Sequence, residues 1–260
     1  MRRSILLSFD VEEFDMPLEY QQDISLKEQL HIGKLGLDAI VPILNDKSIS
    51  TTLFTTATYA INFPEIIKSL AQQHEIASHT YYHSSFEDAH LLSSRLALEA
   101  ITQTPVTGLR MPRMRKVAIH EVLKAGYTYD SSINPTFLPG RYNNLHLPRT
   151  VYQEEAMTRI PASVTPNLRI PLFWLAFKNM PYVLFKKLVI QTLKKDGYVC
   201  LYHHPWEFTD AIANTALPTY TKRQCGKVLI DKLYRLVNDL KKEGDLISIR
   251  DFLTANRKPI

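Results

Sequence analysis

The chain has 260 residues, of which 45% are hydrophobic and 22% are charged, and its formal net charge is +5. These proportions are typical of a soluble globular protein and exclude a disordered or low-complexity chain. The positive charge is scattered along the sequence rather than gathered in one stripe, so we expect no nucleic-acid partner. The length suits a single domain over residues 1–260.

The chain begins MRRSILLSFD, where a basic pair precedes an apolar run. This run is too short for a signal peptide and meets Asp10 at once, so we expect a strand there. No segment has the roughly 18 consecutive apolar residues that a membrane-spanning helix needs. Only Cys200 and Cys225 are present, which argues against a disulfide framework and favours a reducing cytoplasm.

Strand-like and helix-like segments alternate along the sequence. Strands are expected over residues 5–9, 51–55, 75–78, 106–109, 127–130, 198–202 and 246–249. Helices are expected over residues 26–44, 64–70, 117–125, 173–195 with a break at Pro181, and 222–242, and another from a Ser84–Ser85 cap to about residue 101. The proline-rich stretch 135–171 suggests loops and a short hairpin, more like an insertion than a barrel unit. The alternation predicts an α/β fold with parallel strands and right-handed crossovers.

Reactive side chains follow the carboxyl ends of the expected strands. They are Asp10, Glu12, His79, His83, Arg110, Asp130 and His204. In an α/β barrel, active sites are assembled on this face from several loops. We therefore expect these residues to meet at one rim.

The segment SHTYYH places His79 and His83 four residues apart, a spacing that allows both imidazoles to bind one metal ion. The spacing alone is common, and an ordinary surface turn would also produce it. Two histidines and one carboxylate leave open positions on a divalent metal, as a hydrolytic site requires. A second carboxylate would then take the proton of water, and an opposite histidine would protonate the leaving group. Asp10 and His204 suit these two roles.

The segments SFDVEEFD, SHTYYH, RMPR, YDSS and LYHHPWE occur in the order and approximate spacing of the five motifs of the polysaccharide deacetylases, carbohydrate esterase family 4. The DVE and HPWE variants resemble the branch associated with bacterial exopolysaccharide synthesis. The resemblance implies an irregular, TIM-barrel-like (β/α) barrel of about seven parallel strands. It also implies a hydrolase that removes acetyl groups from N-acetylated sugars and binds a divalent metal ion, Zn²⁺ or a related one.

By the same resemblance, Asp10 is the general base, and Arg110 pairs with it and keeps it ionised. His79 and His83 are the metal histidines, and Thr80 holds their loop by hydrogen bonding.

For the second half of the chain, the resemblance makes His204 the general acid and Asp130 the residue that orients it. Trp206 would wall the pocket for the acetyl methyl group. Tyr82, with Tyr81 and Trp174, would line a sugar-binding groove or belong to the core.

Three assignments have rivals. Val11 stands where most members of the family have a second aspartate, so the metal carboxylate is Glu12 or Glu13; we prefer Glu12, because alternation in an extended chain points it to the same side as Asp10. His203 competes with its neighbour His204, which we prefer because it precedes Pro-Trp-Glu. Arg113 indicates either a negatively charged substrate or a surface arginine.

Other functions compete with sugar deacetylation. One is hydrolysis of a non-sugar carbon–nitrogen bond, as in allantoin-cleaving or other amide-cleaving relatives of the same barrel. Another is a non-catalytic glycan-binding protein on a degenerate barrel. The aromatic and basic stretch 173–187 would also suit docking on a membrane that carries a lipid-linked glycan, although we favour core packing for it.

Overall fold

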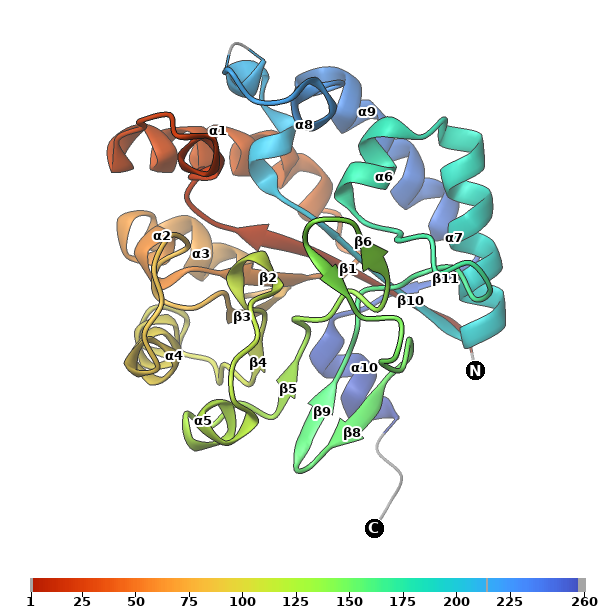
Figure 1. Cartoon of the computed structure of the whole chain (residues 1–260), viewed down its shortest axis with the longest axis horizontal. Coiled ribbons are helices and arrows are strands. Elements are labelled where there is room, and N and C mark those ends of the chain that lie inside the picture. The colour runs from red at the N-terminus through yellow and green to blue at the C-terminus, as the bar shows by residue number, and fades with distance from the viewer. Residues whose placement is uncertain (1, 214, 257–260) are drawn as a thin grey trace.

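The computed structural model describes residues 2–213 and 215–256 and forms a mixed α/β fold around a curled sheet, a half-barrel (Figure 1). In the described residues the main sheet has the spatial order β10-β1-β2-β3-β4-β5-β9-β8, and β11 pairs with β1. All these neighbours are parallel except β8 and β9. The strands are β1 (Arg3–Val11), β2 (Thr52–Thr55), β3 (Glu75–Ser78), β4 (Gly108–Leu109), β5 (Tyr129–Asp130), β8 (Tyr152–Glu154), β9 (Met157–Arg159), β10 (Tyr198–His203) and β11 (Gly244–Leu246). The expected α/β barrel-like fold is confirmed.

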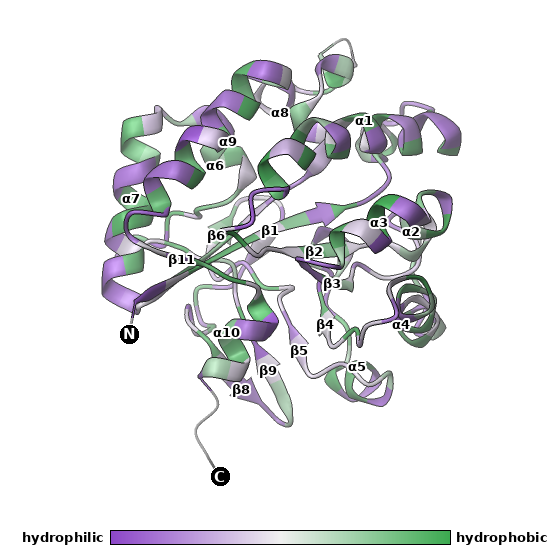
Figure 2. Cartoon of the chain, turned by 180° about the vertical axis from the view of Figure 1, so that it is seen from behind, coloured by the Kyte–Doolittle hydropathy of each residue, from purple (hydrophilic) through white to green (hydrophobic). Residues whose placement is uncertain are grey.

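Helices follow most of the strands, as the alternation predicts (Figure 1). They are α1 (Leu26–Leu44), α2 (Ala57–Asn62), α3 (Pro64–Leu70), α4 (Ala89–Thr102), α5 (Ile119–Lys124), α6 (Trp174–Asn179), α7 (Tyr182–Asp196), α8 (Thr219–Lys222), α9 (Gly226–Leu240) and α10 (Ile249–Ala255). Several of them show a hydrophilic and a hydrophobic side in Figure 2. The apolar side buries surface against the sheet, which is the main source of stability for such helices.

Strand β1 lies in the middle of the fold, and its side chains alternate between two faces. Ile5, Leu7 and Phe9 belong to the large apolar cluster that the sheet shares with α1, α7 and α9. Leu6 belongs to a second cluster, with residues of other strands and of α10. Because alternation has a period of two, Asp10 lies on the same side of the strand as Leu6. The strand therefore delivers its carboxylate to the inner face of the curled sheet.

The structure corrects four predicted boundaries or elements. The helix expected from the Ser84–Ser85 cap begins at Ala89. The strand expected over residues 246–249 is shorter and earlier, and Ser248 instead caps α10 by accepting a hydrogen bond from the Asp251 amide. Helix α2 was not predicted; it begins after Thr56, whose side chain caps it. The long helix expected over residues 222–242 begins later, as α9, and a separate short helix, α8, ends at Lys222.

The region 135–171 contains more of the sheet than the sequence indicates. A small antiparallel hairpin, β6 (Phe137–Leu138) and β7 (Tyr142–Asn143), agrees with the expected insertion. The hairpin of β8 and β9 does not, because β9 pairs in parallel with β5 and extends the main sheet. The prediction that this stretch adds no barrel unit is therefore wrong for residues 152–159.

The aromatic stretch 173–187 packs largely inside the protein. Phe177, Phe185 and the side chain of Lys178 are fully buried, and Trp174 is 8% exposed. These aromatic side chains are therefore not presented to a membrane surface, as the preference for core packing predicts. Among the described helices, none has the length and apolar character to cross a bilayer.

Candidate active site

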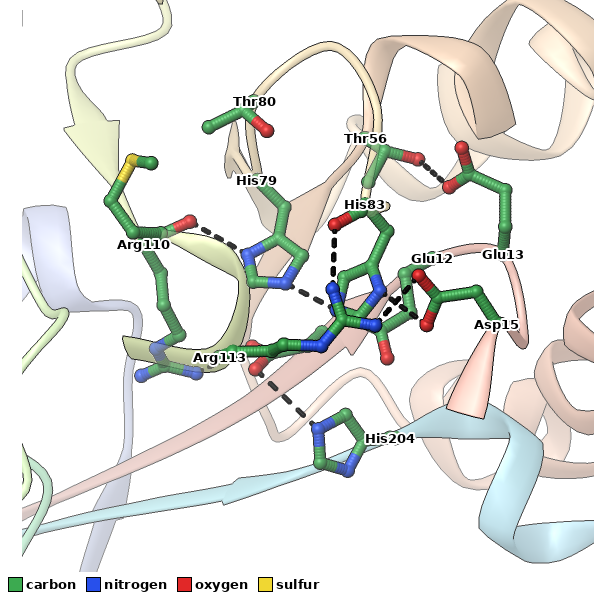
Figure 3. Close-up of polar contacts among 12 residues, drawn as sticks. Glu12, Glu13, Asp15, Thr56, His79, Thr80, His83, Arg110, Arg113 and His204 are labelled. Atoms are coloured by element: carbon green, nitrogen blue, oxygen red, sulfur yellow. Dashed lines mark hydrogen bonds and ion pairs between the residues drawn. The ribbon is translucent and has the colours of Figure 1, made fainter. Parts of the chain in front are cut away.

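A cavity of about 340 Å³ opens at the carboxyl ends of the central strands. Its volume lies in the range of ligand pockets in proteins. Among its lining residues are Asp10, Glu12, His79, His83, His204 and Trp206, which the sequence places far apart. Figure 3 shows the polar side chains at this rim. The expected convergence of these residues is thus present in the structure.

Glu12, His79 and His83 form a buried cluster, and their potential ligand atoms lie within 4.8 Å of one another. The Oε2 atom of Glu12 is 3.0 Å from Nε2 of His79 and 3.1 Å from Nε2 of His83. On the far side of each ring, Nδ1 bonds to an oxygen: the Arg110 carbonyl for His79 and Asp15 Oδ1 for His83, both at 2.7 Å (Figure 3). Because these oxygens accept hydrogen bonds, Nδ1 carries the proton in both rings, and each Nε2 keeps a lone pair unless it is also protonated.

This donor set fits a divalent cation. Two imidazole lone pairs and a carboxylate oxygen that face one another repel unless positive charge lies between them. In addition, Oε2 of Glu12 has no hydrogen-bond partner among the described residues. Burial lowers the pKa of His83, but the charges of Glu12 and Asp15 outweigh burial and raise it to about 9. Burial raises the pKa of Glu12, but the charges of His83 and His204 and the close contact with His79 hold it far below its usual range. The cluster therefore attracts positive charge, and its histidine–carboxylate composition suits zinc and related metals.

The geometry distinguishes Glu12 from Glu13. The carboxylate of Glu13 turns to the other side of the chain and accepts a hydrogen bond from Thr56 Oγ1 at 2.5 Å (Figure 3). Burial raises the pKa of Glu13, so its environment does not favour a charged ligand. Glu12 is the carboxylate that lies with the two histidines, as alternation in β1 predicts.

Asp10 lies beside this cluster and pairs with Arg110. The two side chains are buried, and Arg110 Nη1 is 2.6 Å from Asp10 Oδ1. The same guanidinium donates to Ser8 Oγ and Ser131 Oγ, and it lies 4.0 Å from the centre of the Phe54 ring. A guanidinium held in this way fixes the direction of the carboxylate.

His204 follows β10 directly and faces Asp10 across the rim. Its Nε2 is 3.8 Å from Asp10 Oδ2, and its ring stacks on Trp206 at 4.8 Å between centroids. His203 points to the other face of the strand among Phe177 and other aromatic side chains. Burial lowers the pKa of His203 to about 4, so it stays neutral in the core. The structure therefore favours His204 as the histidine of the site.

The predicted contact between Asp130 and His204 is wrong. In the described residues the Asp130 carboxylate bonds to Arg159 Nη1 at 2.5 Å and to Ser132, and it lines a separate cavity. The reason is strand alternation: the next residue, Ser131, points inward to Arg110, so Asp130 points away from the site.

Three other predicted residues lie in or near the loops of the rim. Thr80 has a left-handed backbone, and its hydroxyl donates to the carbonyl of Tyr82. The Tyr82 side chain is 39% exposed and packs on Tyr81 and His90 rather than lining the cavity. Trp206 lines the cavity and is almost fully buried.

Arg113 is an exposed residue at the edge of the cavity, as the surface-arginine interpretation expects, and its guanidinium is paired with carboxylates. It donates to Asp15 Oδ2 at 2.8 Å and to the carbonyl of His83 at 3.1 Å (Figure 3). It also donates to Glu19 Oε1 at 2.5 Å. It therefore fixes the position of the loop that carries His83.

Two buried carboxylates, for which the sequence allows either a surface position or contact with a site residue, lie against the histidines of the site. Asp15 bonds to the ring of His83, and Glu207 bonds to the backbone and lies near the ring of His204. The signal for both was present, because each carboxylate lies within three residues of a motif residue. Their partners, however, depend on tertiary structure.

Comparison with known proteins agrees with this fold. Residues 3–129, just under half of the chain, match the family model described as polysaccharide deacetylase. No curated protein matches the sequence.

Solved structures share the fold at low sequence identity. A protein from Mycobacterium smegmatis assigned as a polysaccharide deacetylase has 15% identity and a TM-score of 0.65 over 97% of this chain and 89% of that one. One from Pseudomonas aeruginosa PAO1 with the same assignment has 13% identity and a TM-score of 0.64, over 95% and 88%. The Puue allantoinase has 13% identity and a TM-score of 0.63, also over 95% and 88%. These likenesses establish the fold that carries the site.

Proposed function

We propose that this protein is a member of the polysaccharide deacetylases, a metal-dependent hydrolase that removes acetyl groups from N-acetylated sugars of a poly- or oligosaccharide. The observation that carries the proposal is the meeting of three groups around one cavity. These are the cluster of Glu12, His79 and His83, the Asp10–Arg110 pair, and His204. The family match over residues 3–129 supports it.

The metal would be held by Glu12 Oε2 and by Nε2 of His79 and His83. We propose Zn²⁺ or a related divalent ion, in keeping with the donor types. When bound, such an ion supplies polarisation of the acetyl carbonyl and a lowered pKa of water.

The protein side chains would move the protons. Asp10, held in position by Arg110, accepts the proton of the attacking water. His204, on the opposite side, gives a proton to the departing amine, and its pKa supports this role: burial lowers it, but Glu12, Glu207 and Asp10 raise it above the usual value. Trp206 and Trp174 supply an apolar wall that suits the acetyl methyl group and excludes water.

The finer assignments follow from the motif resemblance. The Asp10-Val11-Glu12 and His204-Pro-Trp-Glu segments favour a role in bacterial exopolysaccharide synthesis with a carbohydrate substrate. The free cysteines Cys200 and Cys225 favour a location in the cytoplasm. A lipid-linked precursor is one form of such a substrate. The buried position of the aromatic stretch 173–187 removes it as a reason to expect membrane docking.

A second candidate is hydrolysis of a non-sugar amide or related carbon–nitrogen bond. The likeness in fold to the Puue allantoinase favours it, and the same acid, base and metal cluster would serve this reaction. A third is a glycan-binding protein without activity, since a carbohydrate esterase family 4 pseudoenzyme from Bacillus anthracis also shares the fold, with a TM-score of 0.53.

The deciding experiment is acetate release from a panel of N-acetylated saccharides, with allantoin as the non-sugar substrate. Each is measured with chelator, and again after zinc is added back. We expect acetate release that the chelator abolishes and zinc restores. Hydrolysis of allantoin alone would support the second candidate. No hydrolysis by protein that retains one equivalent of metal would support the third.

The variant Asp10→Asn tests the assignment of the base. It preserves the shape of the side chain, so folding and metal binding should change little while acetate release falls by at least ~10²-fold, the usual contribution of a general base. Asp231→Asn, on the exposed side of α9, is the matched control and should behave like the wild type. Full activity of Asp10→Asn would refute the proposed mechanism.

A further inference from the structure

We infer that a buried pair of Glu207 and Lys178 positions His204 for proton transfer, a task that Asp130 does not perform in this protein. The inference rests on the proposed role of His204 as the general acid. It concerns two residues that contribute no atom to the metal cluster.

Glu207 holds both the backbone and the ring of His204. It lies in the 3-10 helix η3 (Pro205–Phe208) and is fully buried. Its Oε1 accepts the backbone N–H of His204 at 2.8 Å and lies 3.2 Å from Nδ1 of the same residue. One carboxylate oxygen therefore fixes where the residue sits and how its ring is turned.

The contact also selects the tautomer of the neutral ring. An ionised carboxylate only accepts hydrogen bonds, so the proton of the neutral His204 imidazole stays on Nδ1. The other nitrogen, Nε2, then faces Asp10 and the cavity, which is where a general acid must present its proton after the ring is charged.

Lys178 keeps Glu207 ionised at a fully buried position. Its side chain comes from α6, is fully buried, donates to the carbonyl of Thr221 at 2.7 Å and lies 3.6 Å from Glu207 Oε2. That oxygen has no hydrogen-bond partner among the described residues. An isolated carboxylate buried in this way would take up a proton. The ammonium group of Lys178 is the nearby charge that prevents it.

The same helix supports the ring a second time. Trp174 lies one turn before Lys178 on α6 and meets the ring of His204 edge-on at 5.0 Å between centroids. Trp206 covers the ring face. The His204 ring is thus held by one hydrogen-bonding carboxylate and two indoles, and Lys178 connects the carboxylate to the helix that carries one of these indoles.

A merely structural ion pair is the rival interpretation, and the chain permits a clean test of it. Replacing a buried ion pair by apolar residues of similar volume is often neutral or stabilising, whereas removing one partner is costly. The double variant Lys178→Met/Glu207→Leu therefore should fold with a thermal midpoint close to that of the wild type. If the pair were only structural, this variant would also keep wild-type activity.

The experiment measures nitrogen NMR shifts of the His204 side chain at a pH where the ring is neutral, using His204→Gln to assign the signal. In the wild type we expect the proton on Nδ1. In Lys178→Met/Glu207→Leu the ring should populate both tautomers, and kcat for acetate release should fall at least about 10-fold with little change in KM, as expected for a residue that acts through a catalytic group. In Lys178→Met alone, a protonated Glu207 becomes a donor to Nδ1 and should move the ring proton toward Nε2.

Two controls separate the alternatives. Asp130→Asn should leave the His204 signal unchanged, and so should Lys187→Met, the same substitution at an exposed lysine of α7. A double variant with wild-type tautomer and kcat would overturn the inference, and so would a tautomer change in Asp130→Asn. The NMR measurement needs no substrate. If the wild type releases no acetate but Glu207 still sets the tautomer, the proposed function fails and the positioning of His204 stands.

Discussion

The indole Nε1 of Trp206 donates a hydrogen bond to Glu12 Oε1 at 2.9 Å, joining two residues 194 positions apart in the sequence. The same indole stacks on the ring of His204. One carboxylate oxygen of Glu12 is therefore occupied, and the other, Oε2, faces the two histidines. Trp206 thus joins the expected metal cluster to the expected general acid in addition to lining the cavity.

Trp206→Phe should weaken metal binding, because the hydrogen bond that orients Glu12 is lost while most of the apolar wall remains. Partners of metal ligands typically contribute 10- to 100-fold in affinity, so we expect a rise of about that size in the zinc Kd, measured by competition with a chromophoric chelator. Trp174→Phe is the control, since it lines the same cavity and makes its contacts to aromatic rings. Equal zinc affinity in the two variants would contradict this account.

Asp15→Ala should also weaken metal binding, by about 10-fold or more, since the Asp15 carboxylate orients His83 through Nδ1. Glu19→Ala removes the other carboxylate partner of Arg113 and leaves the contact to His83 in place. The zinc Kd of Glu19→Ala is therefore expected to stay within about twofold of the wild type. A similar loss in both variants would mean that Arg113, rather than Asp15, holds the histidine.

Gly36→Ala should disturb the site through the backbone of Pro205 and Trp206. A Cβ atom at Gly36 of α1 would lie 2.1 Å from the carbonyl oxygen of Pro205 and 2.7 Å from Cα of Trp206, and both are backbone atoms that cannot turn aside. Helix α1 or the η3 segment must shift, at a cost of about 1–3 kcal/mol for overpacking, which exceeds the gain of up to about 1 kcal/mol from replacing glycine in a helix. The free energy of unfolding in urea and the rate of acetate release should both decrease. Leu35→Ala, on the exposed side of α1, should leave acetate release unchanged.

The sequence predicted the parts of the site that depend on local pattern. A long buried strand has a definite alternation, so residues 5–12 were enough to place Asp10 and Glu12 on one side and Glu13 on the other. The spacing of His79 and His83 is also a local feature, and it was enough to predict that the two rings lie close together. The placement at the carboxyl ends of strands follows from α/β topology and needed no knowledge of the partners.

The partners across the fold could not be predicted in this way. Strand β5 has only two residues, so alternation alone could not decide whether Asp130 or Ser131 faces the centre. The partner of Asp130, Arg159, lies in a stretch that prolines made look like an insertion. Lys178 reaches its position because a helix expected from its pattern packs over η3, and no local pattern marks a buried lysine as the partner of a glutamate.

His203→Leu should distinguish the two adjacent histidines. Both ring nitrogens of His203 are buried without a hydrogen-bond partner among the described residues, and an unsatisfied buried polar group costs about 1–3 kcal/mol. Leucine has a similar size and no polar atoms, so the variant should be at least as stable as the wild type by urea unfolding. It should also keep its acetate release. A loss of activity with normal stability would move the catalytic role to His203.

A last prediction concerns stability at acidic pH and depends on His74, which lies outside the site. The ring is 4% exposed, Nδ1 accepts the backbone N–H of Thr51, and Nε2 donates to the carbonyl of Leu44. Burial lowers the pKa of His74 from 6.5 to about 4; the hydrogen bond with the Leu44 carbonyl opposes burial, and the charge of Lys47 adds a smaller decrease. The folded state therefore holds this histidine neutral over a pH range where the unfolded chain would protonate it.

Proton linkage determines whether this histidine stabilises or destabilises the folded state as the pH falls. Above pH 6.5 the His74 ring is neutral in both the folded and the unfolded state, and its contribution to stability is fully present. As the pH falls from 6.5 toward 4, the ring becomes protonated in the unfolded state but stays neutral in the folded state. The free energy of unfolding therefore decreases. The lowered pKa of His74 corresponds to a loss on the order of 3 kcal/mol in the free energy of unfolding between pH 6.5 and pH 4.

The variant His74→Gln removes the titrating group. Its free energy of unfolding, measured in urea between pH 7 and pH 5 without metal, should therefore fall less steeply than that of the wild type. His120→Gln, at an exposed position of α5, should retain the wild-type slope. Equal slopes in the wild type and His74→Gln would show that His74 does not cause the acid sensitivity.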